Sequence, residues 1–218
     1  MPSITKENYL KALFFLHQKN EEIAISDLSK NLDLSTPTVN SMVKKLEVIG
    51  WVNYKKYKPI RLTAKGEKEA ALVIRKHRLT EIFLSKIMGF GWEEVHDIAE
   101  EIEHIKSEKL FDKMDEILGY PTVDPHGSPI PSKSGEIVQE EFLKLSQCKK
   151  NSKVKLCSLA DSSAELLLFL NSKDIKLGTE LIIIGIEPFD QSYTVAYDSI
   201  SSLMLSTAVC ERLLVKEI

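Results

Sequence analysis

Apolar residues recur at helical spacing in the first fifty residues, between short polar breaks, and this pattern predicts three helices. Thr5 is a good N-cap for the first helix, and Ser26 can cap a short second helix that ends near Leu32. A four-residue turn follows, and Pro37 suits the first residue of a third helix, which Gly50 ends. The apolar faces of the first and third helices comprise Leu10, Leu13, Phe14, Val39, Met42, Val43, Leu46 and Ile49.

A short helix, a tight turn and a helix with small polar residues followed by lysines are typical of a helix-turn-helix. Residues 51–62 then form two short β-like runs around a lysine-rich tip, which we interpret as a wing. Hydroxyl groups can reach base edges, a proline ring can contact a thymine methyl group, and lysines can neutralise phosphates. A small three-helix domain with a basic surface is the alternative. The predicted DNA-contacting residues are Ser35, Thr36, Pro37, Thr38, Ser41, Lys44, Lys45 and Lys56.

The middle of the chain predicts two further helices with histidines and carboxylates on common faces. Thr63 can cap a long helix through about Met88, on which His77 and Glu81 share a face. A second helix over residues 92–106 has its apolar positions in one arc. The side chains in the opposite arc are His96, Glu100, Glu103 and His104.

These nitrogen and oxygen donors, with no thiolate among them, suit a borderline-to-hard divalent ion such as Mn²⁺, Fe²⁺ or Zn²⁺. The alternative is a solvated acidic face. That alternative explains the histidines less well, because three of the five histidines in the chain lie in this group.

Composition narrows the class of protein. A length of 218 residues with 43% hydrophobic residues suits two or three domains. Residues 1–75 carry a net charge of +5, which suits DNA, and residues 76–140 carry −7, which suits a cation, although scattered surface charge would also give this asymmetry. The longest apolar runs are too short for a membrane span, the N-terminus lacks a secretory signal, and the three cysteines form no close pair. We therefore expect a soluble, cytoplasmic protein.

Four short segments, in this order, carry a specific resemblance. They are RKHRLTE at residues 75–81, VHD at 95–97, AEEIEH at 99–104 and PHGSPIP at 125–131. Together they resemble the diphtheria-toxin-repressor family of metal-dependent regulators, and most closely its three-domain, manganese-responsive members. The resemblance covers essentially the whole chain.

The resemblance implies a mainly α-helical chain with a small β domain. It implies a winged helix-turn-helix domain in residues 1–75, a helical dimerisation and metal-binding domain in 76–140, and a Src-homology-like (FeoA-like) β-barrel in 150–218. The stretch around residues 124–135, rich in Ser, Pro and Gly, would be the linker. The β-like runs that fit the barrel are Val154–Leu159, Glu180–Ile186, Tyr193–Tyr197 and Arg212–Lys216.

The resemblance also implies two metal sites. The primary, activating site would contain Glu100, Glu103, His104 and, from the first helix, Asn8. The ancillary site would contain His77, Glu81, His96 and a carboxylate from the barrel, with Glu165 as the first choice and Asp161 as the second.

Three positions bear on which metal ion the chain would bind and on how many of its ligands are present. Iron-responsive members place a cysteine where this chain has Glu100, and a carboxylate in place of a thiolate favours Mn²⁺, with Fe²⁺ as the alternative. Asn8 stands where relatives have Met or Asp, and it offers only a neutral amide oxygen. It is also the third residue after Thr5, so a capping role is the alternative for Asn8. Lys11 replaces a ligand of the two-domain manganese members.

We therefore expect a homodimeric, metal-dependent repressor that binds a double-stranded DNA operator of metal-uptake genes. Metal would fix the angle between the DNA-binding and dimerisation units and place the two recognition helices about one DNA turn apart. Three alternatives stay open: an iron-responsive repressor of the same family, a di-metal enzyme built on the carboxylate and histidine clusters, and a DNA-binding protein that answers an organic ligand. The chain has no evident nucleophile or Gly-rich substrate motif, so an enzyme is not expected.

Overall fold

The computed structural model describes residues 3–20, 22–56, 58–138 and 140–218. The chain forms two compact units, and each of them contains more than one stretch of sequence. Unit 1 comprises Met1–Thr80, Ala99–Thr122 and Ile130–Val138, and unit 2 comprises Glu81–Ile98, Val123–Pro129 and Gln139–Ile218. In the described parts of the chain, no helix combines the length and the apolar character that crossing a bilayer requires.

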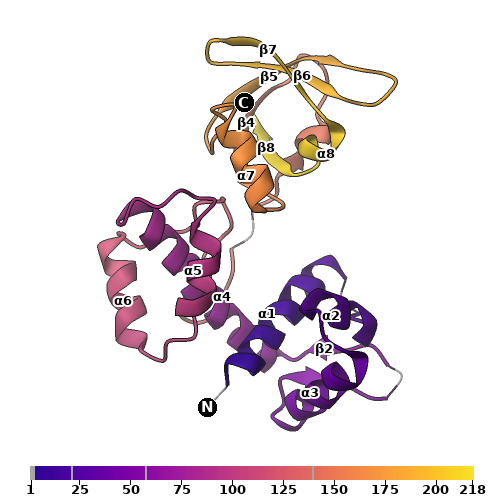
Figure 1. Cartoon of the computed structure of the whole chain (residues 1–218), viewed down its shortest axis with the longest axis vertical. Helices are drawn as coiled ribbons and strands as arrows, with labels where there is room; N and C mark the ends of the chain where they lie inside the picture. The colour runs from indigo at the N-terminus through magenta and orange to yellow at the C-terminus, as the bar shows by residue number, and fades with distance from the viewer. Residues whose placement is uncertain (1–2, 21, 57, 139) are drawn as a thin grey trace. The chain divides into compact units, whose positions relative to one another are not determined.

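The N-terminal part of unit 1 is a helix-turn-helix followed by a two-stranded hairpin, grouped together in Figure 1. Its core contains apolar residues that the helical periodicity predicted, among them Leu13, Val39, Val43 and Leu46. The elements are α1 (Ile4–Lys19), α2 (Ile25–Leu32), α3 (Thr36–Val48), β1 (Val52–Asn53) and β2 (Arg61–Leu62).

The ends of these helices differ slightly from the predicted ends. The first helix begins at Ile4 rather than after Thr5, because the carbonyl oxygen of Ser3 accepts from the backbone N–H groups of Lys6 and Glu7. Asp33 ends α2 in a left-handed conformation, with φ of 51°. Thr36, rather than Pro37, is the first residue of α3. Tyr57, at the tip of the predicted wing, lies outside the described residues.

Helix α4 (Ala64–Lys86) is the predicted long helix, and Thr63 caps it. The hydroxyl of Thr63 accepts from the Gly66 backbone N–H at 3.0 Å and donates to the Gly50 carbonyl at 2.7 Å, so one side chain ties the helix to the end of α3. Helix α5 (Val95–Ile102) is shorter than predicted, because turns replace helix on both sides of it. Helix α6 (Glu108–Ile117) follows, and Ser107 caps it.

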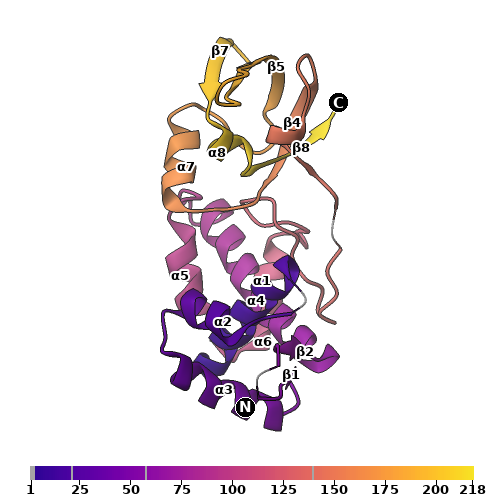
Figure 2. The same cartoon turned by 90° about the vertical axis from the view of Figure 1, so that its right-hand side faces the viewer.

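Unit 2 is built on an antiparallel sheet of six strands in the order β3-β8-β4-β5-β6-β7, and α7 and α8 lie beside it in Figures 1 and 2. Alternate residues of the central strands, such as Val154 and Leu156, are fully buried. The elements are β3 (Leu143–Lys144), η1 (Leu145–Gln147), β4 (Lys153–Leu159), α7 (Ala164–Asn171), β5 (Glu180–Ile186), β6 (Tyr193–Tyr197), β7 (Ile200–Leu205), α8 (Thr207–Cys210) and β8 (Leu213–Glu217).

The predicted β domain is thus confirmed as an antiparallel sheet, and its closure into a barrel stays a prediction. The four predicted β-like runs correspond to β4, β5, β6 and β8. Strand β7 was missed because it is an edge strand whose residues are mostly exposed, so that its sequence lacks a clear apolar alternation.

Candidate metal centres

Two of the predicted primary-site carboxylates meet a predicted ancillary-site histidine inside unit 1. Ligand atoms of His77, Glu100 and Glu103 lie within 4.8 Å of one another, and we call these residues cluster A. Helix α4 supplies His77, the last turn of α5 supplies Glu100, and the turn that follows supplies Glu103. His77 Nδ1 lies 2.6 Å from Glu103 Oε2, and Glu103 is fully buried.

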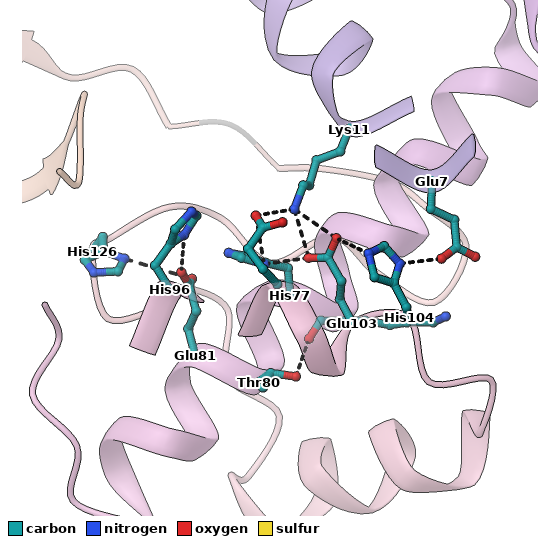
Figure 3. A network of polar contacts seen from close by, with 11 residues as sticks. Glu7, Lys11, His77, Thr80, Glu81, His96, Glu103, His104 and His126 are labelled. Carbon is teal, nitrogen blue, oxygen red and sulfur yellow. Dashed lines mark hydrogen bonds and ion pairs between the residues drawn. The ribbon is translucent and has the colours of Figure 1, made fainter. Parts of the chain in front are cut away.

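The ammonium group of Lys11, on α1, lies among the carboxylates of cluster A (Figure 3). Lys11 Nζ donates to both carboxylate oxygens of Glu103, at 2.9 Å and 3.1 Å, and also to Glu100. Lys11 is only 9% exposed, and it connects the DNA-binding helices with the end of α5 inside unit 1.

A second contact between α1 and this region joins Glu7 and His104. Glu7 Oε2 lies 2.6 Å from His104 Nδ1, and the other ring nitrogen of His104 lies 3.6 Å from Glu103 Oε1. His104 therefore does adjoin the predicted primary site. No periodic signal pointed to Glu7, because its role depends on which face of α1 meets the turn after α5.

Asn8, on α1, has a side-chain oxygen without a hydrogen-bond partner among the residues that the structure describes. This atom, Oδ1, is buried. The capping alternative is not supported, since the helix begins before Thr5. A buried acceptor without a partner carries a free-energy cost, and a ligand role for Asn8 stays a prediction.

The charge of Glu103 follows from its surroundings. Burial by itself would raise the pKa of Glu103, but the hydrogen bond with His77 and the positive charge of Lys11 outweigh burial and lower this pKa. Glu103 is therefore held as a carboxylate, which is the form that binds a cation.

A second cluster lies entirely within unit 2, and we call it cluster B. It consists of Glu81 on α4 and of Asp124 and His126 in the loop before Pro129, and their ligand atoms lie within 4.8 Å of one another. All three are 5% exposed or less. Two carboxylates and an imidazole buried together form a donor set for a divalent ion of the Mn²⁺, Fe²⁺ or Zn²⁺ kind.

The orientation of His126 suits metal binding. Its Nε2 atom lies 2.9 Å from the carbonyl oxygen of Trp92, which can only accept, so this nitrogen carries the proton. In the neutral ring the Nδ1 atom then presents its lone pair, and it lies 3.9 Å from Glu81 Oε2. Metal-binding histidines commonly donate their other N–H group to a backbone carbonyl in this way.

The loop that carries Asp124 and His126 is held in place at several points. Asp124 Oδ1 accepts from the backbone N–H groups of His126 and Ser128, at 2.8 Å and 2.9 Å. The His126 carbonyl accepts from the backbone of Leu159 in β4 at 3.0 Å. Cluster B is thus preformed, which lowers the ordering cost of binding an ion.

The remaining predicted ligands, His96, Glu165 and Asp161, all lie in unit 2. His96 Nδ1 lies 3.4 Å from Glu81 Oε1, so these two predicted ancillary ligands do meet in unit 2. Glu165 is exposed in the first turn of α7. Asp161 accepts from Arg212 Nε at 3.1 Å and from the Ser163 backbone at 3.0 Å.

Sequence reasoning missed Asp124 and His126 as ligands. Both lie at or beside the PHGSPIP segment, which carried the family resemblance. The signal that could have found them is a histidine two residues after an aspartate in a turn-forming stretch. Only the fold brings this loop to Glu81, which lies more than forty residues earlier in the chain.

The predicted DNA-contacting residues are all exposed to solvent. Along α3, the apolar positions Val39, Val43 and Leu46 are fully buried, whereas the predicted contacts face solvent. The Tyr54 hydroxyl donates to Asn40 Oδ1 at 2.8 Å and so attaches the hairpin to α3. The exposed predicted contacts are Ser35, Thr36, Pro37, Thr38, Ser41, Lys44, Lys45 and Lys56.

Two protein families match consecutive parts of the chain. Residues 1–60 match the family described as the iron dependent repressor, N-terminal DNA binding domain. Residues 63–132 match the family described as the iron dependent repressor, metal binding and dimerisation domain. These ranges contain α1 to α6, cluster A and the residues of cluster B.

Characterised relatives agree with these matches. The iron-dependent repressor IdeR of Mycobacterium tuberculosis is 36% identical over 127 residues, which are 58% of this chain and 55% of that protein. The chain thus spans little more than half the length of this relative. The diphtheria toxin repressor of Corynebacterium glutamicum is 30% identical over 192 residues, which are 83% of this chain and 84% of that protein.

Solved structures match the whole chain. The structure of a manganese-dependent transcriptional repressor in complex with manganese has a TM-score of 0.87 at 28% identity, and the match covers 98% of this chain and all of that one. The structure of ScaR with bound Zn²⁺ has a TM-score of 0.80 at 30% identity, and the match covers all of both chains.

Proposed function

The chain belongs to the family of iron-dependent and diphtheria toxin repressors, and from this premise we propose that it is a metal-dependent, DNA-binding transcriptional repressor. It would act in the cytoplasm as a homodimer on a double-stranded DNA operator. The genes that it controls would be those of metal uptake.

The observation that best supports binding of a divalent ion is cluster B. Its two carboxylates and its oriented imidazole are buried and held by a loop that is fixed to β4. Histidine and carboxylate oxygens without thiolate fit the divalent ion that such a repressor needs. We propose that Glu81, Asp124 and His126 hold one such ion as an ancillary site, and that His96, with Glu165 or Asp161, belongs to the same region.

We propose Mn²⁺ as the physiological ion. All the donors of clusters A and B are imidazole nitrogens and carboxylate oxygens, which suit Mn²⁺. The full-length structural match to a manganese-dependent repressor supports this choice. Fe²⁺ is the second candidate, because relatives in sequence are named as iron-dependent repressors.

The primary site of the proposal is the region of cluster A, with Glu100, Glu103, His104 and Asn8. Glu7 of α1 contacts His104 after the end of α5, and we propose the buried Asn8 oxygen, which has no partner in the described part of the chain, as a further, neutral ligand. A bound ion would supply positive charge that holds these donors together. Lys11 contacts Glu103 and Glu7 contacts His104, so both join α1 to this turn, and α1 shares its hydrophobic core with the recognition helix α3.

DNA binding would rest on α3. Its exposed hydroxyl groups can reach base edges, while Lys44 and Lys45 can neutralise phosphates. In a two-fold dimer the two copies of α3 would contact half-sites about one DNA turn apart. A conformational change that alters their separation would then control affinity.

The test is fluorescence anisotropy on a palindromic operator from upstream of a metal-transport gene. Chelated protein is the baseline, and Mn²⁺ and, under anaerobic conditions, Fe²⁺ are titrated. We expect Mn²⁺ to switch binding on and Fe²⁺ to do so poorly. The reverse order would favour the iron-responsive repressor, and tight binding by the chelated protein would contradict a metal-dependent function.

A further inference from the structure

Lys11 is a buried cation placed on the carboxylates of the proposed primary site. Lysine is among the residues least often buried, and burial of its charge requires close partners. Here the partners are both oxygens of Glu103 and one oxygen of Glu100. These are oxygens that a divalent ion would have to use.

We propose that Lys11 is an internal cation that occupies the Glu100–Glu103 pair and competes with a divalent ion for it. Lysine has three N–H donors, and the three contacts made here would employ all of them. An ion bound to the same oxygens would lie next to the ammonium group, and two positive charges at such a distance repel each other strongly in a buried site.

The charges of the groups explain why the Lys11 ammonium group can bind the Glu100–Glu103 pair when no ion is bound. Two carboxylates carry two negative charges, and Lys11 neutralises one of them. A divalent ion would neutralise both and would use the oxygen lone pairs more fully. Lysine sits on a flexible four-carbon stem, so it can leave the pair when an ion arrives. The exchange therefore moves the Lys11 side chain and needs no rearrangement of the backbone that carries the carboxylates.

The position of Lys11 gives this competition a consequence for regulation. Lys11 lies on α1, one turn after Glu7 and three residues after Asn8. Its ion pairs connect α1 to the end of α5 without any metal. Because the ion has to displace Lys11, the strength of these ion pairs sets the ion concentration at which the pair is filled. This inference rests on the metal response proposed above and adds the residue that tunes it.

The test compares Lys11→Met with the wild-type protein by calorimetric titration of Mn²⁺ into the chelated full-length chain, without DNA. Methionine keeps most of the length of the side chain and removes its charge. We expect Mn²⁺ to bind at this pair about tenfold more tightly, or one additional ion per chain to bind. Adding Glu103→Gln to Lys11→Met should abolish the gain, which assigns it to this pair rather than to cluster B.

Two control variants separate competition from a general loss of charge. Lys6→Met removes a positive charge from the same helix, and Lys11→Arg keeps the charge at the site; neither should tighten Mn²⁺ binding. If Lys11→Met does not fold when chelated, Lys11→Gln is titrated instead. The rise in melting temperature on addition of Mn²⁺ should be larger for the neutral variant than for the wild-type protein.

Unchanged or weaker Mn²⁺ binding by both neutral variants would overturn the inference, and Lys11 would then be only a structural ion-pair partner. Because no DNA is present, this result is distinct from a failure of the proposed function. The opposite result is also possible. If the neutral variants bind Mn²⁺ more tightly but the wild-type protein never binds an operator, the competition between Lys11 and the ion is supported and the proposed repressor function is contradicted.

Discussion

Glu7 Oε2 lies 2.6 Å from His104 Nδ1, and this contact joins the first helix of the DNA-binding elements to the turn that follows α5. Both side chains are less than 10% exposed. The contact passes next to Glu103, whose carboxylate also meets Lys11 and His77. A change at Glu103 or His104 therefore acts directly on the contacts of α1.

Replacement of Glu103 or His104 by alanine should abolish metal-dependent operator binding and leave the dimer intact. Each change removes a proposed metal-ligating side chain at the contact between α1 and the turn after α5. The other side chains of unit 1 are unchanged. We expect Mn²⁺-dependent affinity for the operator to fall at least about tenfold. Anisotropy measures the affinity, and sedimentation velocity measures the dimer.

The matched control for this pair is Glu101→Ala, which removes an exposed carboxylate from the last turn of α5, two residues before Glu103 in the chain, and should leave regulation unchanged. Normal Mn²⁺-dependent repression by the Glu103 variant would show that cluster A is not part of the switch. It would then favour a regulator that answers another ligand.

Replacement of His126 by alanine should remove Mn²⁺ binding at cluster B. The imidazole presents Nδ1 toward Glu81, and its loss leaves two buried carboxylates without that donor. We expect the chain to bind one ion fewer, or to bind it at least about tenfold more weakly. Equilibrium dialysis with metal analysis counts the ions. His17→Ala, outside both clusters, is the control, and an unchanged count in the His126 variant would contradict the assignment of cluster B.

Replacement of Gly66 by alanine should destabilise the protein. In the first turns of a helix, alanine normally stabilises relative to glycine by about 1 kcal/mol. Here a Cβ atom at Gly66 would lie 1.9 Å from the carbonyl oxygen of Trp51, which is backbone and cannot move aside cheaply. We therefore expect a loss of about 1 to 3 kcal/mol in the free energy of unfolding, measured by urea denaturation.

Gly89→Ala is the comparison for this change. Gly89 has a φ of +78°, and a Cβ atom added there would have no described atom within 4 Å. Alanine at this position therefore costs backbone strain alone, with no steric clash. A Gly66 variant that is more stable than the wild-type protein would mean that the Trp51 carbonyl does not approach α4 as closely as described.

Replacement of Lys44 by alanine should weaken DNA binding equally for all sequences. The ammonium group is exposed on α3 and is proposed to neutralise a phosphate, which carries no sequence information. The slope of log affinity against log salt concentration should become shallower by about one unit. Lys150→Ala, an exposed lysine in unit 2, is the control. Loss of affinity for the operator alone would instead indicate that Lys44 reads bases.

Local periodicity determined much about this protein. The apolar spacing of Val39, Val43 and Leu46 predicted α3 and its buried face, and the same spacing left the hydroxyls and lysines of that helix exposed. Four strands of unit 2 were predicted within a residue or so. These features follow from the sequence alone, because a helix or strand with one apolar face has a single way to bury it.

The tertiary structure decided which side chains meet. No spacing along the chain indicated that His77 Nδ1 contacts Glu103. The loop with Asp124 and His126 reaches Glu81, and the ammonium group of Lys11 lies on Glu100 and Glu103. Spacing along one helix shows which residues share a face, but it does not show which residue from a distant helix or loop packs against that face. That choice depends on how the helices pack and on where the loops between them run.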